Sequence, residues 1–163
     1  MRDARYLSRV RTESGMMIDQ ELETLYNGYI AAARRAEKGL RPFDGMFGLG
    51  KKLADDPCHQ TFYHEMETLL ARFAEASPES GAVRRALTRI YEAPEKEEEL
   101  PKSVYWGMVA AQGLTIPLIP FLSREDATGL LEVCRRLGSF RRPFPAQKKV
   151  LTELNRQGDG SSV

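Results

Sequence analysis

The sequence has few of the residues that build catalytic, metal or disulfide sites. It contains two cysteines, Cys58 and Cys134, and two histidines, His59 and His64. The cysteines lie far apart and form no C-x-x-C pair, which argues against a disulfide framework and a cysteine zinc site. No Ser/His/Asp, Cys/His or paired-carboxylate arrangement can be assembled from so few candidates. We therefore expect a cytoplasmic protein that is not an enzyme and holds no cofactor and no metal.

The chain also lacks an excess of either charge. Its 24 Lys and Arg residues against 23 Asp and Glu residues give a net charge of +1, and 42% of the residues are apolar. This mixture is typical of a globular protein and indicates no partner by charge alone. No apolar signal segment follows the N-terminal arginines, so we expect no secretory leader. At 163 residues, one domain is long enough to bury its own core.

Strand-like alternation is missing, and helical spacing takes its place. Apolar residues recur three and four positions apart in the predicted helices, which span 19–39, 57–76, 78–93, 103–113, 124–137 and 145–157. We predict an all-α fold, a single-domain irregular bundle of five to six helices. The predicted division is a basic flexible N-terminal arm at 1–17, the domain at 18–157 and a flexible tail at 158–163.

Only one long run, Ser103 to Ser123, carries no charge. It is about as long as the roughly 20 residues that span a membrane. However, Gly107, Pro117 and Pro120 interrupt it and no Lys/Arg asymmetry accompanies it, so we expect no membrane contact. We predict a buried helix at 103–113 followed by a proline-containing extended segment near 114–122. Residues that precede proline are disfavoured in the α region, which supports the extended conformation.

That run also supplies the leading functional hypothesis. An extended segment leaves backbone groups that need hydrogen-bond partners, so one side of it should meet water, another element or a second chain. Core packing would explain the same residues. The hypothesis is a small interaction or adaptor protein that binds a protein partner or self-associates (a homo-oligomer) through an apolar aromatic surface. The predicted surface consists of Tyr105, Trp106, Ile116, Pro117, Ile119, Pro120 and Phe121.

A basic segment supports an alternative function. Residues 135–149 carry six cations and no acid, with Phe140 and Phe144 between them, a composition suited to phosphate contact and base stacking. The alternative is a DNA- or RNA-binding protein. The same residues also fit a structural role, in which two arginines complement a helix dipole and two lysines are solvated. The candidate polyanion-binding residues are Arg135, Arg136, Arg141, Arg142, Lys148 and Lys149.

Two further patterns fit ordinary structure better than a ligand site. Gly45 to Lys51 matches the spacing G-x-x-x-x-G-K of a phosphate-binding loop, but Lys52 stands where that loop needs Ser or Thr and no strand precedes it. We interpret it as a glycine-rich turn. His59 and His64 are five residues apart, about 140° around a helix, whereas two metal ligands on one face need a spacing of three or four.

Overall fold

The computed structural model describes residues 4–39 and 53–160. Within these ranges the chain forms α-helices and 3₁₀ helices and no strand, so the predicted all-α bundle is confirmed. The α-helices are α1 (Ala4–Gly39), α3 (Pro57–Glu75), α4 (Ser80–Lys96), α5 (Lys102–Ala111), α6 (Arg124–Arg136) and α7 (Pro145–Asp159). The 3₁₀ helices are η1 (Leu53–Asp55), η2 (Gln112–Phe121) and η3 (Gly138–Phe140).

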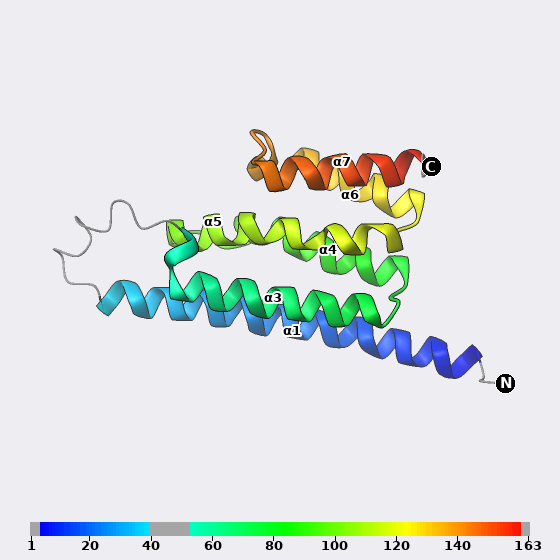
Figure 1. The fold of residues 1–163 in the computed structure, drawn as a ribbon, viewed down its shortest axis with the longest axis horizontal. Coiled ribbons are helices and arrows are strands. Elements are labelled where there is room, and N and C mark those ends of the chain that lie inside the picture. The colour runs from blue at the N-terminus through cyan, green and yellow to red at the C-terminus, as the bar shows by residue number, and fades with distance from the viewer. Residues whose placement is uncertain (1–3, 40–52, 161–163) are drawn as a thin grey trace.

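The helices form three layers, each made of two helices side by side (Figure 1). The first layer pairs α1 with α3, the second pairs α4 with the continuous α5–η2 rod, and the third pairs α6 with α7. Because the chain runs back and forth along the long axis, consecutive helices are also neighbours in space. The uncharged run therefore lies in the middle layer, covered by one layer on each side.

One hydrophobic core joins the three layers. Each layer contributes large side chains with almost no exposed surface, and each such side chain stabilises the fold by about 1.5–3 kcal/mol relative to an exposed one. Apolar residues at helical spacing supply this core, as the sequence predicts. The largest fully buried side chains are Tyr26, Tyr91, Phe62, Leu22, Met66, Leu87, Ile90, Met108, Leu118, Ile119, Leu130 and Leu154.

Local capping chemistry sets three helix starts where the sequence predicts them. The side chain of Asp56 accepts a hydrogen bond from the Cys58 backbone N–H at 2.9 Å, at the start of α3. The hydroxyl of Ser123 accepts one from the Asp126 N–H at 3.1 Å, at the start of α6. Pro145 occupies the first position of α7, where a missing N–H costs nothing.

The start of α1 differs from the prediction. The sequence predicts a start at residue 19, but the helix begins at Ala4. Ile18 is buried, and a Cβ placed on Gly15 would lie 3.2 Å from Ala82 of α4. Packing against α4 therefore continues the helix beyond Asp19 towards its N-terminus. Much of the predicted arm is thus helical, and α7 likewise extends to Asp159, while the division into arm, domain and tail stays a prediction.

Pro94 was expected to end α4, and this was wrong because the helix continues to Lys96. A proline inside a helix removes one N–H, so the carbonyl of residue i−4 loses its intrahelical donor. That carbonyl belongs to Ile90, and the side-chain Nε2 of Gln112 donates to it at 3.5 Å. Gln112 also donates to the Tyr91 carbonyl at 3.3 Å. A donor from the α5–η2 rod thus replaces the one that proline lacks.

The predicted extended conformation near 114–122 was also wrong, because residues 112–121 form the 3₁₀ helix η2. Proline fixes φ near −65°, a value that a 3₁₀ helix accepts. With three residues per turn, Pro117 and Pro120 lie on one exposed side, and Thr115 and Leu118 are buried on another. The helical hydrogen bonds satisfy backbone groups that an extended segment would leave open.

Candidate functional site

Beyond the exposed Lys102 at its start, the α5–η2 rod carries no charged residue. Five of its exposed and half-exposed residues lie four, three, four and three positions apart, a spacing that follows one side of an α-helix through α5, while within η2 it is Pro117 and Pro120, three apart, that share a side. We call them the α5–η2 strip: Trp106, Ala110, Gly113, Pro117 and Pro120. The strip lies between α3 and α7, which flank the rod in the first and third layers (Figure 1).

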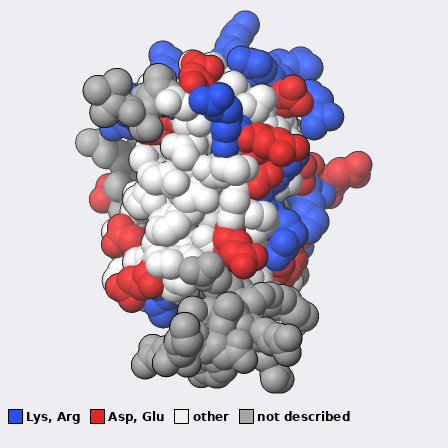
Figure 2. All heavy atoms as spheres, turned by 90° about the vertical axis from the view of Figure 1, so that its right-hand side faces the viewer, with Lys and Arg blue, Asp and Glu red and all other residues white. Residues whose placement is uncertain are grey.

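Uncharged surface also covers part of the end of the bundle where η2 leads into α6. Viewed from this end, Lys, Arg, Asp and Glu side chains lie along the top and on both sides, and uncharged residues fill the middle (Figure 2). Pro120 is exposed and Phe121 is half-buried in the last turn of η2. The charged side chains of this face therefore leave an uncharged area between them. The chain as a whole is nearly neutral.

An aromatic cluster lies at the other end of the strip. The ring of Trp106 packs between the rings of Tyr105 and Phe144, with centroid distances of 5.0 and 4.9 Å and interplanar angles of 86° and 77°. Trp106 is 43% exposed and Phe144 is 46% exposed. Edge-to-face contacts of this kind hold rings in place. The cluster is therefore an ordered aromatic surface that remains open to a partner.

Most of the predicted partner surface is accessible, but its residues form two groups. Tyr105 and Trp106 lie at the start of α5, and the other members lie in η2. Ile119 is only 1% exposed and belongs to the core, so its place in the predicted surface was wrong. The turn of the 3₁₀ helix directs it inward beside Leu118. Of the η2 group, two are half-buried (Ile116 and Phe121) and two are exposed (Pro117 and Pro120).

Phe144 is a member of this surface that the sequence prediction missed. It was counted with the basic segment, 38 positions beyond Trp106 (144 minus 106). Its contact with Trp106 arises because α7 packs beside the α5–η2 rod, a tertiary feature. A Cβ on Gly113 would likewise lie 3.2 Å from Ala146 of α7. The only sequence signal was a large aromatic residue directly before a helix-starting proline.

The six predicted polyanion-binding cations are all exposed, and among the described residues none of them forms an ion pair. The end of α6 and the start of α7 meet at one end of the bundle, so the structure brings the segment together there (Figure 1). Arg135 and Arg136 lie in the last turn of α6, where they also favour the helix dipole. Polyanion binding by these residues stays a prediction.

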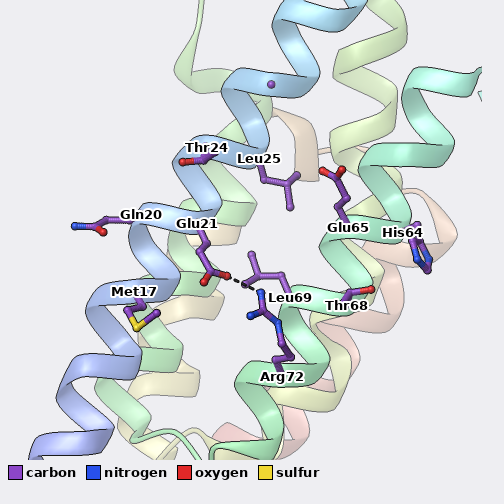
Figure 3. A pocket seen from close by; sticks show the side chains of 11 residues that line it. Met17, Gln20, Glu21, Thr24, Leu25, His64, Glu65, Thr68, Leu69 and Arg72 are labelled. Carbon is purple, nitrogen blue, oxygen red and sulfur yellow. Dashed lines mark hydrogen bonds and ion pairs between the residues drawn. The ribbon is translucent and has the colours of Figure 1, made fainter.

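A groove of about 880 Å³ runs between α1 and α3 (Figure 3). Leu25 and Leu69 lie between the helices, and an ion pair of 2.8 Å joins Arg72 of α3 to Glu21 of α1 across it. His64 points away from α1, towards solvent. An exposed ion pair of this kind contributes at most about 1 kcal/mol. The lining mixes both charges without converging on one point, so it indicates no particular ligand.

His59 lies in the core. It is 8% exposed, and burial lowers the pKa of its imidazole below the usual range. The negative charge of Asp56 acts in the other direction and raises this pKa, but by less than burial lowers it. The neutral form therefore dominates at neutral pH. Across residues 4–39 and 53–160, no three His, Cys, Asp or Glu side chains come together as metal ligands. The glycine-rich pattern from Gly45 to Lys51 lies outside the described residues.

Both cysteines are free thiols. Cys134 has no exposed surface, and burial raises the pKa of its thiol to about 12. Because the thiolate is the reactive form, this cysteine stays protonated and inert at neutral pH. Cys58 is half-buried at the start of α3. The structure thus places no disulfide between them.

By length and composition alone, one segment of the described residues, Lys102–Phe121, is apolar enough to cross a membrane. Its mean hydropathy is 1.3, and half of it is buried inside the protein. A core helix of a soluble protein passes the same test. The packing of α5 and η2 between two layers accounts for the buried half, and the strip accounts for the rest.

Comparison of the chain with protein-family models, with curated proteins and with solved structures found no match. The function must therefore be inferred from the residues and their arrangement.

Proposed function

We propose that this chain is a protein-interaction module that self-associates, with the α5–η2 strip of one copy packed against the same strip of a second. The observation that carries the proposal is an uncharged, solvent-facing strip with an ordered, exposed tryptophan at one end. Aromatic anchors of this kind supply much of the binding energy of protein interfaces. Two-fold dimers use the same patch on both copies, so the patch has to complement itself.

The absence of charge makes the strip suitable for this role. Two copies that meet along it bring no like charges together, and a net charge of +1 adds little repulsion at a distance. Ala110 has a small side chain, which lets a facing helix approach closely. Pro117 and Pro120 are rigid apolar residues that lose little conformational freedom on binding. A helix of a different partner would meet the same features, and the experiment below separates the two occupants.

A charge placed on the strip is expected to separate the copies. The double substitution Pro117→Glu and Pro120→Glu would bury unpaired carboxylates in the dimer, so the dissociation constant should rise about 100-fold. Trp106→Ala, which removes the anchor, should raise it about tenfold or more. Light scattering during size-exclusion chromatography, over a concentration series, measures both effects.

Ala36→Glu is the matched control, because it adds a carboxylate at an exposed position of α1, on another helix. It should associate like the wild-type chain. Circular dichroism of each variant establishes that the helices are retained. A wild-type chain that remains monomeric throughout the series would contradict self-association, as would strip variants that dimerise as tightly as the control.

The exposed, unpaired cations favour one second candidate, binding to single-stranded nucleic acid. Arg141 and Arg142 follow η3 and lie close in sequence to Phe144, whose ring is available for base stacking. Arg141→Glu and Arg142→Glu together should weaken a low-salt gel shift of single-stranded RNA at least several-fold and reduce its dependence on salt. Arg35→Glu, an exposed cation on α1, is the control. A wild-type chain that shifts no RNA at low salt would remove this candidate.

A further inference from the structure

A concave pocket lies between the end of α4 and the start of α5, next to the aromatic cluster. Its volume is about 480 Å³, which falls within the roughly 300–1,000 Å³ of small-molecule sites. The pocket is distinct from the α5–η2 strip and shares only Trp106 with it. Its lining residues are Pro94, Glu97, Glu99, Leu100, Lys102 and Tyr105, together with Trp106.

Part of the lining is apolar and aromatic. Pro94 and Leu100 contribute aliphatic surface, and the rings of Tyr105 and Trp106 stand at 86° to each other. The face of an aromatic ring is negative and attracts a cation within about 6 Å of its centre. Two rings at nearly a right angle can therefore bound two sides of one cationic group. The Trp106 ring also contacts the Phe144 ring. Trp106 is therefore already held in place before a ligand binds, which lowers the entropic cost of binding.

The rest of the lining is predominantly acidic. The carboxylates of Glu97 and Glu99 are exposed in the pocket, against the single cation of Lys102. Glu99 has a φ of +61°, an uncommon conformation for a residue with a side chain. Burial and the charge of Glu95 both raise the pKa of the Tyr105 hydroxyl, which is consistent with a negative field around its ring. The Arg34 guanidinium lies 3.8 Å from Glu97, so this carboxylate is already partly compensated, whereas Glu99 forms no ion pair among the described residues.

From this combination of rings and carboxylates, we propose that the pocket binds an alkylated ammonium group, as in a trimethylated lysine side chain or a free quaternary ammonium compound. A bare ammonium is strongly hydrated and loses that hydration against apolar walls. Alkyl groups spread the charge and pack against the rings, and the carboxylates complement the charge that remains. The proposal stands on the pocket alone and holds whether or not the strip mediates self-association.

Trp106 reports on this pocket directly, because it is the single tryptophan of the chain. Its fluorescence is followed while the full chain is titrated with tetramethylammonium chloride, N-acetyl-trimethyllysine amide, or a neutral tert-butyl analogue of that amide, at constant ionic strength. We expect a saturable change with both cations and at least tenfold weaker binding of the neutral analogue. No saturable change, or equal binding of the neutral analogue, would overturn the proposal. Tighter binding of the lysine derivative indicates a modified side chain on a partner, and equal binding of the two cations indicates a free small molecule.

Glu97, Glu98 and Glu99 belong to the connector between α4 and α5, and variants of this connector test which carboxylates take part in cation binding. Glu97→Gln and Glu99→Gln should each weaken cation binding about three- to tenfold, and Tyr105→Leu should abolish most of it. Glu98→Gln is the matched control, because Glu98 belongs to the same connector but does not line the pocket. An equal effect of Glu98→Gln would show that only the overall charge matters. The Pro117→Glu and Pro120→Glu variant should retain cation binding, so failure of this proposal and failure of self-association are distinguishable.

Discussion

Replacing Gly107 with alanine is expected to lower the free energy of unfolding by about 2–3 kcal/mol, although alanine normally stabilises a helix interior by about 1 kcal/mol relative to glycine. Gly107 lies in α5 and is buried against the first layer. A Cβ at this position would overlap the hydroxyl of Tyr29 from α1 and come within 2.9 Å of Nδ1 of His59 from α3. The penalty therefore arises from steric overlap with two helices at once.

Neither neighbour can easily move away from the new methyl group. Tyr29 is 4% exposed, its ring stacks on Phe62 at a centroid distance of 4.2 Å, and its hydroxyl donates to the Ser103 carbonyl at 3.3 Å. The His59 ring is held in the core, with no hydrogen-bond partner for its buried Nδ1 among the described residues. Both are rigid groups in a densely packed interior, which does not absorb an extra carbon without strain.

Urea unfolding of Gly107→Ala measures the loss, and Gly28→Ala is the control. Gly28 is exposed inside α1, and no atom lies within 4 Å of its added Cβ, so this change should stabilise the protein by about 0.5–1 kcal/mol. Adding Tyr29→Phe to Gly107→Ala removes the overlapping oxygen and should recover part of the stability. If Gly107→Ala were as stable as wild type, the close packing of α5 on the first layer would be incorrect.

The helices and three of their starts could be predicted because the chemistry that sets them is local. Asp56 and Ser123 cap helices with bonds to residues two and three positions along the chain. Apolar spacing then supplied the core, because buried positions in a bundle repeat with the helical period.

The conformations around the prolines could not be predicted in the same way. The sequence indicates that Pro94 deprives Ile90 of a donor, but it does not show that Gln112, far along the chain, supplies another. The residues before Pro117 and Pro120 were expected to be extended, because a residue before proline is disfavoured in the α region. They lie instead in the 3₁₀ helix η2. For Pro94, a contact between two helices of the second layer supplies the donor, which no local sequence rule can show.

The candidate site shows the same division. Trp106 and the uncharged run are visible in the sequence, whereas the contact of Trp106 with Phe144 depends on the packing of α7. Nothing in the sequence distinguishes the glutamates at 95 and 97–99 from an ordinary solvated run, since a run of like charges is usually solvated. Folding brings Glu97 and Glu99 to the same pocket as Tyr105. The chemistry of that pocket therefore becomes apparent only when the second layer is assembled.

Gln112→Met is expected to lower the free energy of unfolding by about 3 kcal/mol. The Gln112 side chain is fully buried where the second and third layers meet. Its Nε2 donates to the carbonyls of Ile90 and Tyr91, and its Oε1 accepts from Nε2 of Gln147 in α7 at 3.0 Å. Methionine has a similar volume but offers none of these bonds. Each buried polar group left without a partner costs about 1–3 kcal/mol.

A second substitution tests whether the missing N–H of Pro94 is the reason for this cost. Pro94→Ala restores an N–H that can donate to the Ile90 carbonyl inside α4. In that background, Gln112→Met should cost about 1 kcal/mol less than in the wild-type chain, because one of its orphaned acceptors is then satisfied. Chemical denaturation of the wild type, both single variants and the double variant completes the thermodynamic cycle. Strictly additive losses would mean that Gln112 stabilises the bundle only through Tyr91 and Gln147, because a restored donor to the Ile90 carbonyl would then not reduce the cost of losing Gln112.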